Sequence, residues 1–138
     1  MKQLILILTF LFPVSSFADW AEVVTTGDGT TYYLDVETIK ERNGLVYYWI
    51  LIEYSKPSST GVLSAKRLWE LNCNAPRKQR IISFSYYSTQ LGTGTPLVTY
   101  NEEKQWMSSQ LHPVQKSTME EVCGLNDLYK RDIKGYIK

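Results

Sequence analysis

The middle of the chain carries two adjoining patterns of apolar and polar positions. Residues 45–54 (LVYYWILIEY) form an almost unbroken run of apolar and aromatic residues. Such a run is typical of a central strand that is covered on both faces. Residues 62–73 (VLSAKRLWELNC) alternate instead, and the short segment between the two runs contains Pro57 and Gly61. The pattern therefore predicts a β-hairpin on which the rest of the fold is organised.

The second arm of this hairpin places apolar residues at every other position. One face, on which Arg67 is the exception, carries Leu63, Ala65, Trp69, Leu71 and Cys73. The opposite face carries Ser64, Lys66, Glu70 and Asn72. A period of two predicts a strand with one buried face and one solvated face.

Glycine-rich turns divide the rest of the chain into shorter strands. We expect these strands at residues 20–26, 31–35, 78–90 and 97–100. Asn43-Gly44 is a strong hairpin signal directly in front of the central strand. In the strand at residues 78–90, one face carries Ile82, Phe84 and Tyr86, and the other carries Ile81, Ser83, Ser85 and Tyr87. Residues 36–42 and 101–110 fit either an extended or a helical segment.

The C-terminal part has a helical pattern. Residues 117–120 (STME) have the spacing of a capping box, after which Met119, Val122 and Cys123 share one face of a short helix. Gly124 is the expected stop, and residues 125–137 either prolong the helix or trail off. This order of elements, with the strands first and the helix last, predicts a mainly β fold at the border of the α+β class. We expect an antiparallel, strongly twisted sheet of about six strands, with the helix packed on one face.

The central strand offers more apolar surface than one short helix can cover. Its two faces carry Leu45, Tyr47, Trp49 and Leu51 on one side, and Val46, Tyr48, Ile50, Ile52 and Tyr54 on the other. Bare apolar patches of this size are unusual on a soluble monomer. We therefore expect either strong curvature of the sheet or a homodimer, and favour curvature because a long strand coils readily.

The N-terminus predicts export. Lys2, the apolar run at residues 4–12 and the small residues around Ala18 form a secretory signal, with cleavage after Ala18. The chain then divides into a signal peptide (1–18), a β domain with its helix (19–128) and a basic tail (129–138). The mature chain is neutral, because it retains 14 acidic residues and all but one of the 15 basic ones. Neutral charge argues against nucleic acid as a partner, and export places the protein in the periplasm or at the cell surface.

Two cysteines in an exported chain predict one disulfide, Cys73–Cys123. The loop that it closes is long enough for a stabilisation of roughly 4 kcal/mol in the chain-entropy model. The alternatives are a redox-active thiol pair and a metal site. Both are disfavoured, since there is no C-x-x-C motif and His112 is the only histidine.

Other candidate chemistry is weak, so we expect no catalytic, cofactor-binding or metal-binding residue and no cofactor. His112 has no nucleophile motif nearby, and Gly92-x-Gly94 lacks the lysine of a phosphate-binding loop. Three carboxylates, Asp35, Glu53 and Glu70, come from separate strands. The ten tyrosines and four tryptophans suit a sheet core, or alternatively an exposed tyrosine-rich binding face.

Taken together, these residues resemble the surface-adhesin protein E family of Gram-negative bacteria. The resemblance spans residues 20–123 and rests on Trp20, Tyr33, Asp35, Thr38, Ile39, Asn43, Gly44, Trp49, Tyr54, Ser64, Lys66, Glu70, Cys73, Tyr87, Gly92, Gly94, Trp106, Pro113, Ser117, Val122 and Cys123. It implies a disulfide-stapled antiparallel sheet and a non-enzymatic protein that adheres to host matrix or serum proteins of the laminin, vitronectin and plasminogen class. The ligand-binding residues are not implied. The alternative is a soluble periplasmic envelope protein without a host ligand.

Overall fold

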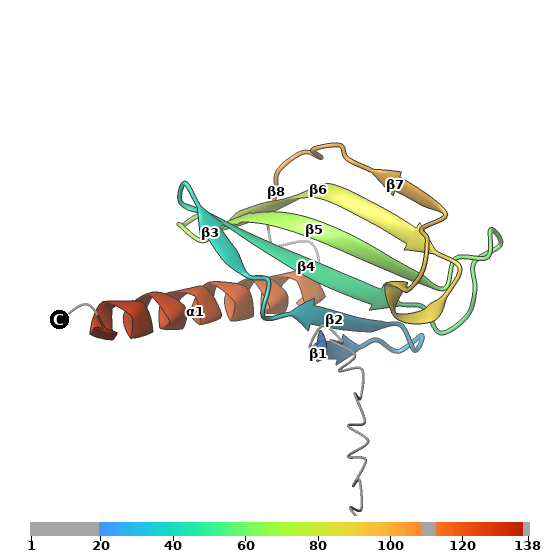
Figure 1. Cartoon of the computed structure of the whole chain (residues 1–138), viewed down its shortest axis with the longest axis horizontal. Helices are drawn as coiled ribbons and strands as arrows, with labels where there is room; N and C mark the ends of the chain where they lie inside the picture. Colours follow the sequence, from blue (N-terminus) through green and yellow to red (C-terminus); the bar gives the residue numbers. More distant parts are fainter. Residues whose placement is uncertain (1–19, 109–112, 137–138) are drawn as a thin grey trace, which may run out of the picture.

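An antiparallel sheet with one long helix beneath it forms the structure, a computed structural model that describes residues 20–108 and 113–136 (Figure 1). The elements in chain order are β1 (Trp20–Thr25), β2 (Thr31–Asp35), β3 (Lys40–Arg42), β4 (Leu45–Glu53), β5 (Ser64–Asn72), β6 (Lys78–Tyr87), the 3₁₀ turn η1 (Gln90–Gly92), β7 (Val98–Tyr100), β8 (Met107–Ser108) and α1 (Pro113–Tyr136). His112 and the signal peptide lie outside the described residues. No helix within 20–108 or 113–136 is long and apolar enough to cross a membrane.

The sheet is a meander with the order β1-β2-β4-β5-β6-β7. The short strands β3 and β8 pair with β4 and β6, so β2 and β3 lie end to end along one side of β4. The expected central hairpin is confirmed as β4 and β5, which pair from Val46 opposite Leu71 to Glu53 opposite Ser64. Asn43 and Gly44 both have positive φ, at 51° and 79°, as the predicted two-residue turn requires.

The helix covers one face of β4 and forms the main core with it. Val46, Tyr48 and Ile52 on this face are at most 2% exposed, and they belong to the same cluster as Met119 and Val122 of α1, which are fully buried. The predicted disulfide is confirmed: Cys73 follows β5 and bonds Cys123 of α1, with the two Cα atoms 5.8 Å apart. The disulfide therefore ties the central hairpin to the helix.

The opposite face of β4 is closed at one end by the sheet itself. Leu51 is fully buried there, and Lys66 lies opposite it on β5. The side chain of Lys66 in turn lies against Trp20 of β1, Tyr87 of β6 and Gly92 of η1. The strong curvature expected from the sequence is confirmed, while the homodimer stays a prediction.

The helix is longer than the local signals predicted. It begins at Pro113, so the expected capping box at residues 117–120 is wrong, and the Thr118 hydroxyl donates to the Val114 carbonyl at 2.8 Å inside the helix. Gly124 does not end it. A mid-helix glycine costs only about 1 kcal/mol relative to alanine. Beyond it, the Asn126 amide and the Lys130 ammonium both contact the Glu41 carboxylate of β3, which ties this part of the helix to the sheet.

The predicted faces of β6 are wrong in its first half. Leu68 of β5 lies opposite Ser83, but Trp69 lies opposite Ile81, so β6 contains one extra residue at Ile82. This bulge reverses the alternation, and Ile81 packs against the core on the helix side. The second half of β6 keeps the predicted phase, with Phe84 and Tyr86 on one face.

Candidate functional site

The helix covers only part of its side of the sheet, and tyrosines line the part that it leaves open. In Figure 1, α1 runs under the β3 end of the sheet and continues past it, away from β7. Strand pairing places Tyr32 opposite Ile52, Tyr86 opposite Ala65, and Phe84 opposite Arg67 on the face that faces the helix. We call this uncovered region the tyrosine face and define it by its aromatic residues Tyr32, Tyr54, Phe84, Tyr86 and Tyr100.

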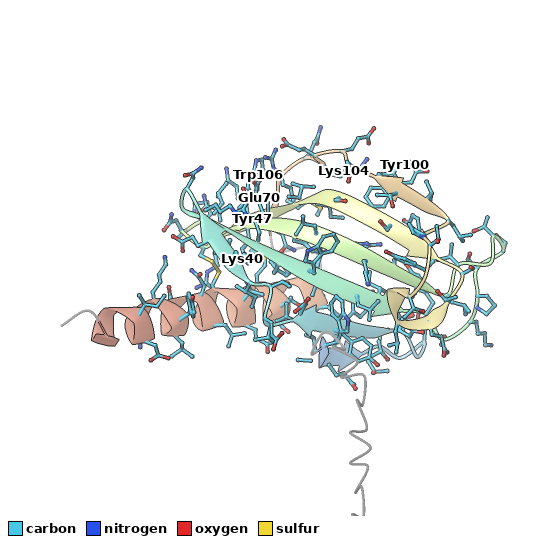
Figure 2. All side chains as sticks on the ribbon, in the orientation of Figure 1. Lys40, Tyr47, Glu70, Tyr100, Lys104 and Trp106 are labelled. Carbon is cyan, nitrogen blue, oxygen red and sulfur yellow. A yellow bond between two sulfur atoms is a disulfide. The ribbon has the colours of Figure 1, made fainter. Side chains whose placement is uncertain are left out.

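The aromatic rings of the tyrosine face contact one another across β6 and β7. Phe84 stacks on Tyr100 with ring centroids 4.8 Å apart and meets Tyr86 edge-on at 5.7 Å. The Lys104 ammonium lies 5.4 Å from the centre of the Phe84 ring, and Figure 2 shows Lys104 and Tyr100 close together at this edge of the sheet. Such pairs hold the rings in place, so the surface that they present is preorganised.

The outer edge of this face is exposed and apolar. Strand β7 ends the sheet, and its residues Val98 and Tyr100 are 37% and 44% exposed, with the preceding Leu97 at 53%. Beside it runs a groove of about 650 Å³ lined by Tyr54, Lys56, Ser58, Thr60, Val62, Tyr86, Leu97 and Val98. Burial raises the pKa of Tyr54, so its phenol stays protonated and can donate a hydrogen bond. An edge strand with an adjoining apolar groove is a surface suited to a partner protein.

A second hollow of about 480 Å³ lies between the sheet and the start of α1. Ile50, Ile52 and Trp69 form its apolar wall, and Arg67 also lines it. Tyr48 lies deeper and donates to the Gln79 side-chain oxygen at 2.5 Å. Burial raises the pKa of Tyr48, so this phenol remains neutral. Arg67 is the one charged residue on the otherwise apolar face of β5, and it thus places a cation among apolar side chains.

The other face of the sheet holds a lysine in a structural nest. Trp20 and Tyr87 flank Lys66 with ring centroids 5.8 and 5.5 Å from its ammonium. Burial lowers the pKa of Lys66, and the nearby Asp35 carboxylate offsets part of this shift. The Ser64 hydroxyl accepts a hydrogen bond from the Gly92 amide at 2.9 Å and donates to the Thr89 carbonyl at 2.6 Å, which fixes η1 over the lysine.

A hydrogen-bonded ionic cluster lies at the far end of the same face. Glu70 accepts hydrogen bonds from the Tyr47 hydroxyl at 2.6 Å and from Arg80 Nε at 2.5 Å. Arg80 also pairs with Glu103 and lies over the ring of Trp106, 4.8 Å from its centre. Burial raises the pKa of Glu70, but these two hydrogen bonds outweigh it, so the pKa lies below its usual value. Glu70, Tyr47 and Trp106 are labelled in Figure 2.

The three carboxylates considered from the sequence have separate partners. Asp35 interacts with Lys66, and Glu70 belongs to the ionic cluster. Glu53 Oε2 accepts the Leu91 amide at 2.7 Å, and its Oε1 is buried without a hydrogen-bond partner among the described residues. The Gly92-x-Gly94 segment lies in the loop between β6 and β7, where Gly92 packs on the side chain of Lys66. Within the described part of the chain, no three His, Cys, Asp or Glu side chains gather as metal ligands.

The helix carries a further exposed apolar patch where it projects beyond the sheet. Leu128, Tyr129 and Ile133 are 56%, 67% and 42% exposed. A hollow of about 1000 Å³ lies between this part of α1 and residues 36–42, with Val36 and Ile39 in its wall. Of the residues predicted to form a basic tail, 129–136 continue the helix.

A curled antiparallel meander, stapled to a C-terminal helix and open to solvent on an aromatic half-face, is a small domain suited to binding. The chain belongs to the surface-adhesin protein E family, whose family model, "Surface-adhesin protein E", matches residues 20–124. Protein E of Haemophilus influenzae, in its second crystal form, has a similar fold, with a TM-score of 0.59 over 81% of this chain and 92% of that one. The two are 18% identical in sequence, and no curated protein matches this chain.

The residues that carried the family resemblance occupy the structural clusters. Trp20, Ser64, Lys66, Tyr87 and Gly92 build the lysine nest, while Glu70 and Trp106 belong to the ionic cluster. Of the resemblance residues, Tyr54 alone belongs to the tyrosine face. The tyrosine face could have been found from the sequence by pairing the strands, since the tyrosines at positions 32, 54, 86 and 100 fall on one side once the register is known.

Proposed function

We propose that this protein is a surface adhesin that binds extracellular-matrix or serum proteins of a host, of the laminin, vitronectin and plasminogen class, without catalysing a reaction. The observation that carries the proposal is the family match over residues 20–124. A predicted signal peptide at residues 1–18 supports export, which an adhesin requires.

The tyrosine face is the surface that we propose for contact. Tyrosine, tryptophan and arginine dominate the energetics of protein interfaces, because their large rigid side chains bury much area at little entropic cost. Tyr100 and Leu97 extend from an edge strand, and the groove beside them is lined mostly by apolar atoms of Tyr54, Tyr86 and Val98. A segment of a host protein seated in the groove would bury these side chains together.

Binding by the purified mature domain tests the proposal. Surface plasmon resonance on immobilised laminin, vitronectin and plasminogen should show binding to at least one of the three. Tyr100→Ala should weaken it by about 30-fold, the effect of losing a contact worth about 2 kcal/mol. Tyr129→Ala is the matched control, since this tyrosine is more exposed and lies on the far part of α1. Equal loss in both variants would exclude the tyrosine face, and no binding to any of the three would exclude these host ligands.

The cellular location of the protein distinguishes the adhesin hypothesis from the alternative, a periplasmic envelope protein without a host ligand. An adhesin must be accessible from outside, so protease added to intact cells should degrade the protein. Protection in intact cells, with degradation only after the outer membrane is opened, would favour the periplasmic protein. A periplasmic marker should remain intact in the same experiment, which verifies that the cells are sealed.

A further inference from the structure

We propose that the hollow between the sheet and the start of α1 binds a small amphipathic carboxylate of the fatty-acid type, whose head group pairs with Arg67. Tyr32 also lines this hollow, so the site adjoins the tyrosine face, but the proposal does not depend on adhesion. The hollow measures about 480 Å³, which falls within the range typical of small-molecule sites. The cation and the walls each indicate the chemistry of the ligand.

The cation is placed where an apolar residue is expected. Arg67 lies between Ile50 of β4 and Phe84 of β6 on the buried phase of β5. No carboxylate of the described residues lies within ion-pair distance of its guanidinium. A half-buried guanidinium with five donors is best satisfied by an anion that accepts two parallel hydrogen bonds. A carboxylate has that geometry.

Asp28 is the acidic residue that lines the hollow. Its carboxylate is already hydrogen-bonded within the turn between β1 and β2. Its carboxylate accepts hydrogen bonds from the Thr26 hydroxyl at 2.6 Å and from the Thr30 amide at 3.0 Å. The Asp28 carboxylate therefore stabilises the conformation of its own loop. Arg67 interacts with the Tyr54 hydroxyl, but this phenol is neutral, so the positive charge of Arg67 remains available for an anion.

The walls require that the ligand also have an apolar body. The apolar and aromatic side chains that line the hollow are Tyr32, Tyr48, Ile50, Ile52, Trp69 and Val114. Val114 and Gln115 of the first helical turn close the other side. The N-terminal end of a helix favours a negative charge, which adds to the attraction by Arg67. One anionic head and one aliphatic chain satisfy both parts of the site.

Isothermal titration of the mature protein with three probes tests this assignment. Dodecanoate carries the head and the chain, dodecanol carries the chain without the charge, and acetate carries the head alone. We expect dodecanoate to bind one per chain, dodecanol to bind more weakly and acetate to show no binding. Arg67→Gln should weaken dodecanoate by about 10- to 100-fold, as expected for a lost charge-assisted hydrogen bond, and leave dodecanol unchanged.

Three further variants distinguish this site from non-specific uptake. Arg131→Gln removes the same charge from an exposed position on α1 and should bind dodecanoate like the wild type. Arg67→Lys keeps the charge but loses the two parallel hydrogen bonds, so its affinity for dodecanoate should lie between those of the wild type and Arg67→Gln. Gln115→Trp fills the hollow from the helix side and should weaken dodecanoate and dodecanol alike. Circular dichroism verifies that each variant is folded.

Two results would overturn the proposal. One is that folded wild-type protein fails to bind dodecanoate. The other is that Arg67→Gln and Arg131→Gln bind dodecanoate equally well, which would mean that dodecanoate binds elsewhere on the protein. Loss of dodecanoate binding in Arg67→Gln together with retained dodecanol binding would support it, whatever the outcome of the adhesion experiments.

Discussion

Replacing Gly92 with alanine should destabilise the fold by a clash that can be traced to one neighbour. Gly92 has a φ of 57°, and a Cβ placed on it would lie 2.5 Å from Cε of Lys66 and 3.0 Å from its Cγ. Lys66 cannot easily move aside, because Trp20 and Tyr87 flank its ammonium and its stem is half-buried. The new methyl group therefore has to displace the lysine, the turn, or both.

The size of the effect follows from two contributions. A non-glycine residue in the left-handed region costs about 1–2 kcal/mol. Overpacking of a filled site typically adds about 1–3 kcal/mol. Gly92→Ala should therefore lower the free energy of unfolding by about 2–5 kcal/mol. Gly94 is the matched control, because its φ is 72° but no atom lies within 4 Å of a Cβ there, so Gly94→Ala should cost the first contribution alone.

Urea denaturation of the two variants, and of both in a Lys66→Ala background, measures these contributions. Truncating Lys66 opens the space for the methyl group, so Gly92→Ala should become nearly as mild as Gly94→Ala. The coupling between positions 66 and 92 should be at least about 1 kcal/mol. Equal losses for Gly92→Ala and Gly94→Ala, or zero coupling with Lys66→Ala, would refute the packing of η1 over the lysine nest.

Three further predictions concern the disulfide, the core and the ionic cluster. Thiol titration of denatured, non-reduced protein should find no free thiol, and Cys73→Ala should cost roughly 4 kcal/mol; two thiols per chain would contradict the bond. Ile50→Lys should unfold the domain by circular dichroism, because Ile50 is 6% exposed and a lysine there would be buried unpaired; a folded variant would contradict the core. The pKa of Glu70 lies below its ordinary value of 4.5, so its stabilisation holds above that value and is lost as the pH falls through the lower folded pKa. Wild-type stability should thus fall more steeply in acid than that of Glu70→Gln, and parallel profiles would contradict the cluster.

Local sequence signals predicted much of the sheet, because turns and alternation are decided by neighbouring residues. Asn43 and Gly44 adopt the positive φ values of the expected turn, and β4 and β5 pair as the expected hairpin. The prediction that the polar face of β5 is solvated is wrong, because Ser64 is buried under η1 and Glu70 is buried in the ionic cluster. The disulfide followed from the inward phase of Cys73 and the presence of one other cysteine. The need for curvature followed from the amount of apolar surface on the central strand.

The remaining features depend on contacts between distant segments, which local patterns do not contain. The bulge at Ile82 is decided by the pairing of β5 with β6, and it turns Ile81 toward the core against its predicted phase. Past Gly124, the helix contacts the sheet through Asn126 and Lys130, which both reach Glu41 of β3. The tyrosine face is formed by residues from four separate segments, so it becomes visible only when their register is known.

Adhesion of intact cells tests the central claim most directly, because it requires export, surface exposure and the tyrosine face together. Cells that display the wild-type protein should adhere to surfaces coated with laminin, vitronectin or plasminogen more strongly than cells that lack it. Cells with Tyr100→Ala should lose this adhesion at the same surface level of protein, and cells with Tyr129→Ala should keep it. Adhesion that is the same with the wild type, with Tyr100→Ala and without the protein would contradict the account.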